Sequence, residues 1–226
     1  MNENMICKIY NEDCIITMNS MDDEVIDLII ADPPYGMQFR SNHRYEQYDK
    51  IHGDDNLDWL PSWSKECYRI LKNNTHLYCF CSYHNIDIFK QELQKHFNIK
   101  NILVWEKNNT GMGDLTGDYA PKYEMIIFCV KGKRILNGRR DSNIIYSQKT
   151  KNELHPTQKP TYLIRKLIAK SSLMNDVIYD PFMGSGTTAI SCIMEKRRWM
   201  GSEINEKYVE TAYKRIDIEL NQLKIF

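Results

Sequence analysis

Residues 28–36 read LIIADPPYG, and the interpretation of the whole chain starts from this stretch. Its first four residues form a short apolar run with the length and composition of a buried strand. Proline cannot donate to a sheet ladder, so the predicted strand must end at Pro33. Asp32 and Tyr35 are therefore expected just past the carboxyl end of a strand, where open α/β sheets bind their ligands. A plain turn that uses the acid only as a turn residue fits the same letters.

A second stretch, residues 177–188, repeats the pattern as VIYDPFMGSGTT. An apolar run again ends in an acid, a proline and an aromatic residue, and a Gly-Ser-Gly turn follows. Residues 189–194 then read as a helix packed against the sheet. Glycines let the backbone bend tightly and approach a ligand, while the helix N-terminus offers free N–H groups. A lone Gly-x-Gly is weak evidence, and it lacks the last glycine of a dinucleotide fingerprint. The two stretches together are a much stronger signal.

Together the two stretches resemble the amino-methyltransferases of DNA, which use S-adenosylmethionine to methylate exocyclic base nitrogens. Residues 32–35 resemble the catalytic motif of that family, and residues 180–188 resemble its cofactor loop. The catalytic motif comes first, as in the circularly permuted β group. The resemblance implies one catalytic domain over residues 1–226, with a doubly wound, mostly parallel, Rossmann-like α/β sheet and one antiparallel strand at an edge, expected over residues 123–130.

The resemblance also implies roles for the residues of the catalytic motif. An exocyclic amine is a poor nucleophile because its lone pair is delocalised into the ring. The carboxylate of Asp32 and the backbone carbonyl of Pro33 would accept hydrogen bonds from this amine, and Pro33 and Pro34 would hold both acceptors in place. Tyr35 would stack on the base once it has left the duplex. No metal ion is expected in this chemistry.

Cofactor contacts are expected from five separate parts of the chain. By resemblance they are Asp13 and Cys14; Asp32; Thr157, Lys159 and Pro160; Asp180, Pro181, Phe182, Gly184, Ser185, Gly186 and Thr187; and Glu203 and Ile204. Glu203 follows the glycine loop by about twenty residues, the spacing at which an acid meets ribose hydroxyls. Thr157 and Lys159 suit the cofactor's carboxylate. Asp13 would contact the adenine, although it could equally be a helix cap.

Two polar segments are candidates for contact with DNA. Residues 37–58 lack clear periodicity and are expected to form a substrate-side loop. Residues 132–154 are strongly basic, and the target-recognition region of the β group falls in this interval, although the segment is short for one. Lys and Arg contact phosphates, and Arg also reads base edges. The candidate DNA contacts are Arg40, Arg44, Lys133, Arg134, Arg139 and Arg140. A solvated surface loop is the alternative for both segments.

Composition limits how the chain can bind DNA and indicates the cellular compartment in which it is expected. Lys and Arg number 30, as do Asp and Glu, so any grip on DNA must come from local patches. The seven cysteines are scattered without metal-binding spacing, which predicts reduced thiols in a cytoplasmic protein. No signal peptide or membrane-length apolar run is visible. The resemblance adds a homodimer as an expectation, since β-group enzymes often pair.

The acid at the first position of the catalytic motif points to a particular base. In this family an acid there goes mostly with adenine N6, and a serine goes mostly with cytosine N4. Asp32 therefore predicts an adenine-specific DNA methyltransferase. Three alternatives stay open: a cytosine-N4 enzyme, a non-catalytic nucleic-acid-binding subunit, and an RNA or protein methyltransferase. The target sequence and any companion restriction enzyme are not readable from the chain.

Overall fold

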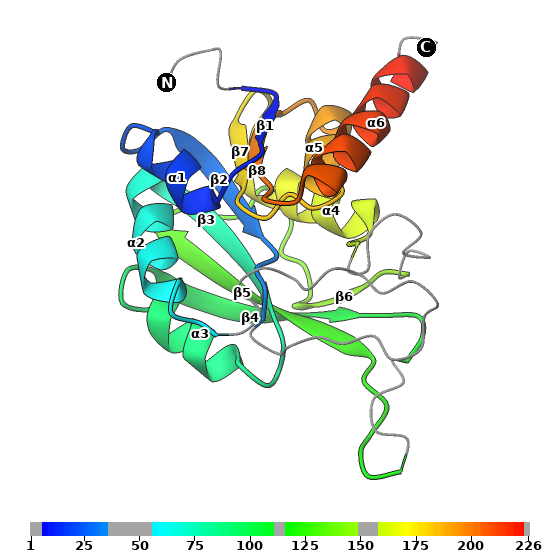
Figure 1. Ribbon diagram of the computed structural model, residues 1–226. Coiled ribbons are helices and arrows are strands. Elements are labelled where there is room, and N and C mark those ends of the chain that lie inside the picture. The colour runs from blue at the N-terminus through cyan, green and yellow to red at the C-terminus, as the bar shows by residue number, and fades with distance from the viewer. Residues whose placement is uncertain (1–5, 36–55, 111–115, 149–157, 224–226) are drawn as a thin grey trace.

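The computed structural model describes residues 6–35, 56–110, 116–148 and 158–223, and its strands form one eight-stranded sheet (Figure 1). The strands are β1 (Lys8–Tyr10), β2 (Ile26–Ala31), β3 (Leu71–Cys81), β4 (Asn98–Glu106), β5 (Tyr123–Lys131), β6 (Ile144–Tyr146), β7 (Val177–Asp180) and β8 (Arg198–Ser202). The helices are α1 (Cys14–Asn19), α2 (Leu60–Ile70), α3 (Ile86–Leu93), α4 (Thr161–Ser171), α5 (Thr187–Met194) and α6 (Glu206–Leu223). In space the strands follow the order β1-β8-β7-β2-β3-β5-β4-β6. The predicted mostly parallel α/β fold is confirmed.

Strands β2 and β7 are neighbours in the sheet and lie parallel. Leu28 is opposite Ile178, and Ile29 is opposite Tyr179. Every residue of both strands is buried, as expected for parallel strands covered on both faces. Because the carboxyl ends of parallel neighbours meet at one edge, the two quoted stretches of sequence are brought together there.

Helices cover both faces of the sheet, so the fold is doubly wound (Figure 1). Leu28 and Ile30 of β2 join the hydrophobic cluster that includes residues from α4, α5 and α6. Ile29 and Ala31 point the other way and join the cluster that includes residues from α1, α2 and α3. The period of two along a strand thus assigns each apolar side chain to one of two cores.

The antiparallel strand is β5, as the sequence predicts, but its expected position at the edge of the sheet is wrong. It pairs with β3 on one side and β4 on the other, and β6 lies beyond β4. Strand β6 falls within the segment predicted to be a basic loop. Its three residues are too few to show a periodic pattern, yet Ile145 is buried and the Trp105 indole nearby donates to the Ser147 carbonyl at 2.9 Å.

All seven cysteines are free thiols, and only Cys7 is exposed. Within the described ranges, no group of three or more His, Cys, Asp and Glu side chains is arranged to hold a metal ion. In the same part of the chain no helix combines the length and apolar character needed to cross a membrane.

Candidate active site

The carboxyl edge of the parallel strands carries four of the predicted site acids. Asp32 directly follows β2, Asp180 ends β7, and Glu203 directly follows β8. Asp13 lies shortly after β1, which is parallel to β8. The fold therefore collects acids that are up to 190 positions apart in the sequence, because each comes at the end of a strand that runs in the same direction.

Both carboxylate oxygens of Asp32 are occupied by partners. The Tyr35 hydroxyl donates to Oδ1 at 2.6 Å, and the Lys159 ammonium lies 2.6 Å from Oδ2. About a fifth of the Asp32 side chain remains exposed. Burial raises the pKa of Asp32 above its usual value, while the charge of Lys159 opposes the rise. The Asn85 amide donates to the Tyr35 carbonyl and ties the end of the motif to the start of α3.

Lys159 lies between two carboxylates. Besides Asp32, its ammonium is 3.1 Å from Oε2 of Glu124 on β5, and the Lys107 ammonium is 2.7 Å from the other oxygen of Glu124. Burial acts to lower the pKa of Lys159, but the two carboxylates hold it above its usual value. Burial likewise acts to raise the pKa of Glu124, and the two lysines hold it below its usual value.

The loop after β7 is held by Asp180. Its carboxylate accepts the Phe182 N–H at 2.9 Å and the Thr188 hydroxyl at 2.5 Å, so the acid braces both ends of the turn. Burial raises the pKa of Asp180 to about 7. Gly186 has a φ of +83°, and a Cβ there would lie 2.9 Å from Cβ of Ala212 on α6. Only glycine meets both conditions without strain.

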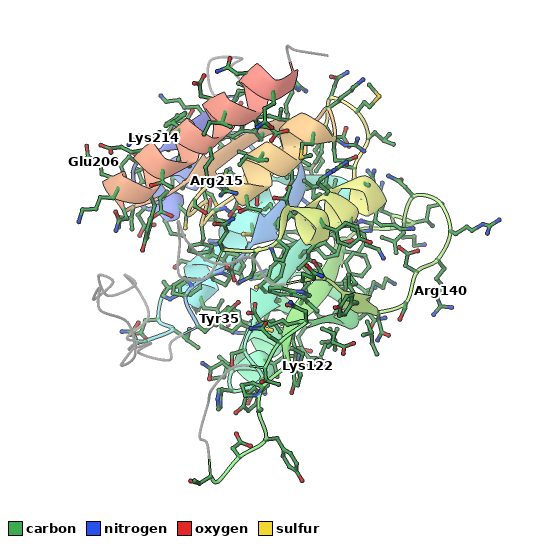
Figure 2. The ribbon with its side chains drawn as sticks, turned by 90° about the vertical axis from the view of Figure 1, so that its right-hand side faces the viewer. Tyr35, Lys122, Arg140, Glu206, Lys214 and Arg215 are labelled. Atoms are coloured by element: carbon green, nitrogen blue, oxygen red, sulfur yellow. The ribbon has the colours of Figure 1, made fainter. Side chains whose placement is uncertain are left out.

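Glu203 fastens the same loop from the other side. One carboxylate oxygen accepts the Gly184 N–H and the other accepts the Asn205 N–H, each at 2.8 Å. Burial raises the pKa of Glu203 above its usual value. From α6, the Arg215 guanidinium donates to the carbonyl and the hydroxyl of Ser185, and Figure 2 shows this side chain among those beneath the helix. The loop is thus fixed by side chains from two other elements.

A family model described as DNA methylase matches residues 26–214, which is most of the chain and includes both quoted stretches. The chain belongs to the DNA methylase family. The Type II methyltransferase M.HinfI of Haemophilus influenzae is 32% identical over 259 residues, which cover 96% of this chain and 72% of that relative. The DNA adenine methyltransferase YhdJ of Escherichia coli (strain K12) is 29% identical over 247 residues, with 93% and 82% covered.

A solved structure agrees with this assignment. The crystal structure of the M1.HpyAVI-SAM complex superimposes on the methylase with a TM-score of 0.71 at 26% sequence identity. The match covers 92% of this chain and 98% of that chain. The likeness therefore extends over nearly the whole chain.

Several predicted cofactor residues of the methylase lie around this edge. Asp13 caps α1 by accepting the Ile15 N–H at 2.8 Å, and Cys14 is the buried first residue of that helix. Ile204 is 47% exposed beside Glu203. The remaining loop residues lie within the stretch from Asp180 to the first residue of α5; they are Pro181, Phe182, Ser185 and Thr187. Pro160 occupies the N-cap position of α4, next to Lys159. Thr157 lies outside the described residues.

The predicted DNA contacts that the structure describes are not brought to the carboxyl edge of the parallel strands. Lys133 and Arg134 follow the carboxyl end of β5, which runs antiparallel to β3, so they lie at the opposite edge from Asp32. Arg139 and Arg140 are exposed, and Figure 2 shows Arg140 at the outer margin, well away from Tyr35. Arg40 and Arg44, with most of the 37–58 loop and the end of the 132–154 segment, fall outside the described residues.

Sequence reasoning missed four residues that hold the site of the methylase together. They are Asn85, Lys107, Glu124 and Arg215. Glu124 had a detectable signal, since it is the one acid of strand β5 and is followed by a run of apolar residues. Arg215 had none, because it is one of several cations on an amphipathic helix.

Proposed function

We propose that this methylase transfers a methyl group from S-adenosylmethionine to the exocyclic N6 of adenine in DNA. The observation that carries the proposal is the position of Asp32. Its carboxylate lies at the carboxyl edge of the sheet, directly after a buried strand and beside the strand that leads into the glycine loop. The name of YhdJ, a DNA adenine methyltransferase with related sequence along nearly the whole chain, supports the choice of adenine.

The residues around the glycine loop fit S-adenosylmethionine. The half-buried carboxylate of Glu203 and the backbone of Gly184 suit the hydroxyls of a ribose, and the partly exposed ring of Phe182 suits a flat base. The carboxylate of Asp32 suits the cationic end of the molecule. When bound, S-adenosylmethionine supplies an electrophilic methyl group on its sulfonium sulfur. The roles given to the individual residues here are part of the proposal.

The catalytic motif acts by orienting the amine of the base. Asp32 accepts an amine N–H, and the backbone carbonyl of Pro33, held by the rigid ring, accepts the other. In this proposal an amine that bonds to Oδ1 of Asp32 takes the place of the Tyr35 hydroxyl, which now lies 2.6 Å from that oxygen. This exchange frees the Tyr35 ring to stack on a base that has left the duplex. Alignment of nitrogen and methyl then provides much of the rate enhancement.

Further parts of the proposal rest on the family resemblance. They are a single catalytic domain over residues 1–226, the circularly permuted β group, cytoplasmic location and a homodimer. Contacts to the DNA backbone are proposed for the substrate-side loop with Arg40 and Arg44 and for the basic segment with Lys133, Arg134, Arg139 and Arg140. Arg134 and Asp32 lie at opposite edges of the sheet, so the basic segment would bind the DNA backbone at a distance from the reacting base.

The test is a base assignment with labelled S-adenosylmethionine. Purified protein is incubated with unmethylated DNA, the DNA is digested, and the nucleosides are separated by chromatography, with an Asp32→Ala variant alongside. Label in N6-methyladenine that disappears in the variant is the expected result. Label in N4-methylcytosine would keep the mechanism and overturn the base, and the absence of label from every DNA nucleoside would overturn the substrate class.

A further inference from the structure

Four charged side chains of alternating sign run from one end of β4 to the catalytic motif. In order they are Lys107, Glu124, Lys159 and Asp32, joined by contacts of 2.7, 3.1 and 2.6 Å. They come from four different places in the chain: the residue after β4, strand β5, the turn before α4 and the residue after β2. The side chain of Lys159 is 8% exposed and that of Glu124 is 22% exposed. The row is therefore largely inside the protein.

A purely structural role explains this row poorly. Removing charges from water is expensive, and a buried ion pair is often no more stabilising than apolar residues of similar volume. Strand β5 is otherwise apolar around Glu124, with Ile126 and Ile127 fully buried. An apolar residue at position 124 would suit the sheet and would leave Lys159 with Asp32 as its single carboxylate partner. What Glu124 adds is a second negative charge beside the Lys159 ammonium, through a buried Oε2 that makes no hydrogen bond of its own.

We propose that Glu124 is a positioning residue for methyl transfer, because it holds the Lys159 ammonium when the amine of the base takes the Asp32 carboxylate. The inference rests on the proposed function of Asp32. In the structure Lys159 is closer to Asp32 than to Glu124, at 2.6 against 3.1 Å. The amine takes Oδ1, and Lys159 keeps its contact with Oδ2 because Glu124 holds the ammonium from its other side and Lys107 keeps Glu124 itself fixed. The cation stays in place, so Asp32 remains ionised.

The charges around Asp32 predict the direction in which its titration moves when Glu124 is replaced. The titratable groups around it are Tyr35, Cys79, Cys81, Glu124, Lys159 and, on the neighbouring strand, Asp180. The negative charge of Glu124 acts to raise the pKa of Asp32, and that of Lys159 acts to lower it. Replacing Glu124 by a neutral isostere therefore shifts the titration of Asp32 to lower pH. A loss of packing alone would not produce this directed shift.

The test compares Glu124→Gln with the wild-type chain and with two further variants. Glu124→Asp keeps the charge on a shorter side chain. Glu106→Gln is the matched control, because Glu106 pairs with Lys122 at 2.9 Å near the same end of the hairpin without an ion pair to Lys159. Urea unfolding first establishes that each variant folds. Methyl transfer to DNA is then measured as kcat and KM, and the Asp32 carboxyl carbon is titrated by NMR in the free protein.

For Glu124→Gln we expect kcat to fall by about 10- to 100-fold, the scale of a misplaced reacting group. The KM for S-adenosylmethionine should stay within about threefold of wild type, since the substitution affects the orientation of the reacting groups and not the binding of the cofactor. The Asp32 titration should move to lower pH, Glu124→Asp should recover part of kcat, and Glu106→Gln should change neither quantity.

Two results would overturn the inference: an unchanged kcat in a folded Glu124→Gln, or an Asp32 titration that does not move. The failure of the proposed function looks different. In that case the wild-type chain itself transfers no methyl group to DNA, and the carboxyl titration, which needs no turnover, still decides whether Glu124 acts on Asp32.

Discussion

The buried acid that braces the glycine loop should make the protein more stable when its charge is removed. In the Asp180→Asn variant the side-chain oxygen can still accept the Phe182 N–H, and the new amide can donate to the Thr188 hydroxyl oxygen. Shape and hydrogen bonds are thus retained, and the difference between the two proteins is the ionisation of one carboxyl group. Function should suffer, because the acid lies at the mouth of the cofactor loop.

The size of the effect follows from the pKa of Asp180, which burial raises to about 7 from an ordinary 3.8. A carboxyl group that binds its proton more tightly when folded makes the protein less stable as the pH rises between these two values. Each pKa unit is worth about 1.4 kcal/mol, so the full difference is about 4 kcal/mol. At pH 5 only about 1.5 kcal/mol has been lost, and the remaining ~3 kcal/mol is lost between pH 5 and pH 8.

Urea unfolding at pH 5 and pH 8 measures this difference. The free energy of unfolding of Asp180→Asn, relative to wild type, should be about 3 kcal/mol larger at pH 8 than at pH 5, which means a relatively more stable variant at pH 8. Asp217→Asn is the control, since it removes the same charge from an exposed position on α6. A relative stability of Asp180→Asn that is the same at both pH values, or lower at pH 8, would refute the reasoning.

Three further substitutions test separate parts of the structure. Gly186→Ala puts a Cβ 2.9 Å from the Cβ of Ala212 on a residue with a φ of +83°. Thermal and urea unfolding should show a stability lower by about 1–3 kcal/mol; an unchanged stability would contradict the expected backbone and packing strain. The buried Lys131 ammonium donates to two backbone carbonyls, and Lys131→Met removes this donor. Urea unfolding should therefore show a stability lower by about 2–3 kcal/mol, whereas a higher stability would mean that apolar packing outweighs these hydrogen bonds. In Glu203→Gln the side-chain NH2 group must face a backbone N–H, because each carboxylate oxygen of Glu203 accepts one such N–H. Calorimetry should show that S-adenosylmethionine binds about tenfold more weakly; wild-type affinity would argue against a role for Glu203 in the cofactor site.

The meeting of Asp32 and Asp180 could be predicted from the sequence alone. Each acid follows an apolar run that a proline terminates, and parallel strands with buried faces place such ends at one edge. The signal is local in both places and predicts the shared edge, whereas the direct pairing of β2 with β7 is known only from the structure. The family resemblance rested on the same two stretches, and the match of the family model over residues 26–214 confirms it.

The ion pairs of Lys159 could not be predicted in this way. They depend on where β5 lies in the sheet, and a local pattern cannot tell an edge strand from one inserted between β3 and β4. The expected contact of Lys159 with the cofactor stays a prediction, to which the structure adds the pairing with Asp32 and Glu124. Similarly, the basic composition of residues 132–154 carried no information about which edge of the sheet Lys133 would occupy.

The central claim is that the Asp32 carboxylate orients the base amine for methyl transfer. The most direct measurement is single-turnover methylation of DNA by Asp32→Asn at saturating S-adenosylmethionine, with folding verified by urea unfolding. The account predicts a rate at least about 100-fold below wild type, because the asparagine amide places a donor where the amine needs an acceptor. A rate within a few-fold of wild type would contradict the account.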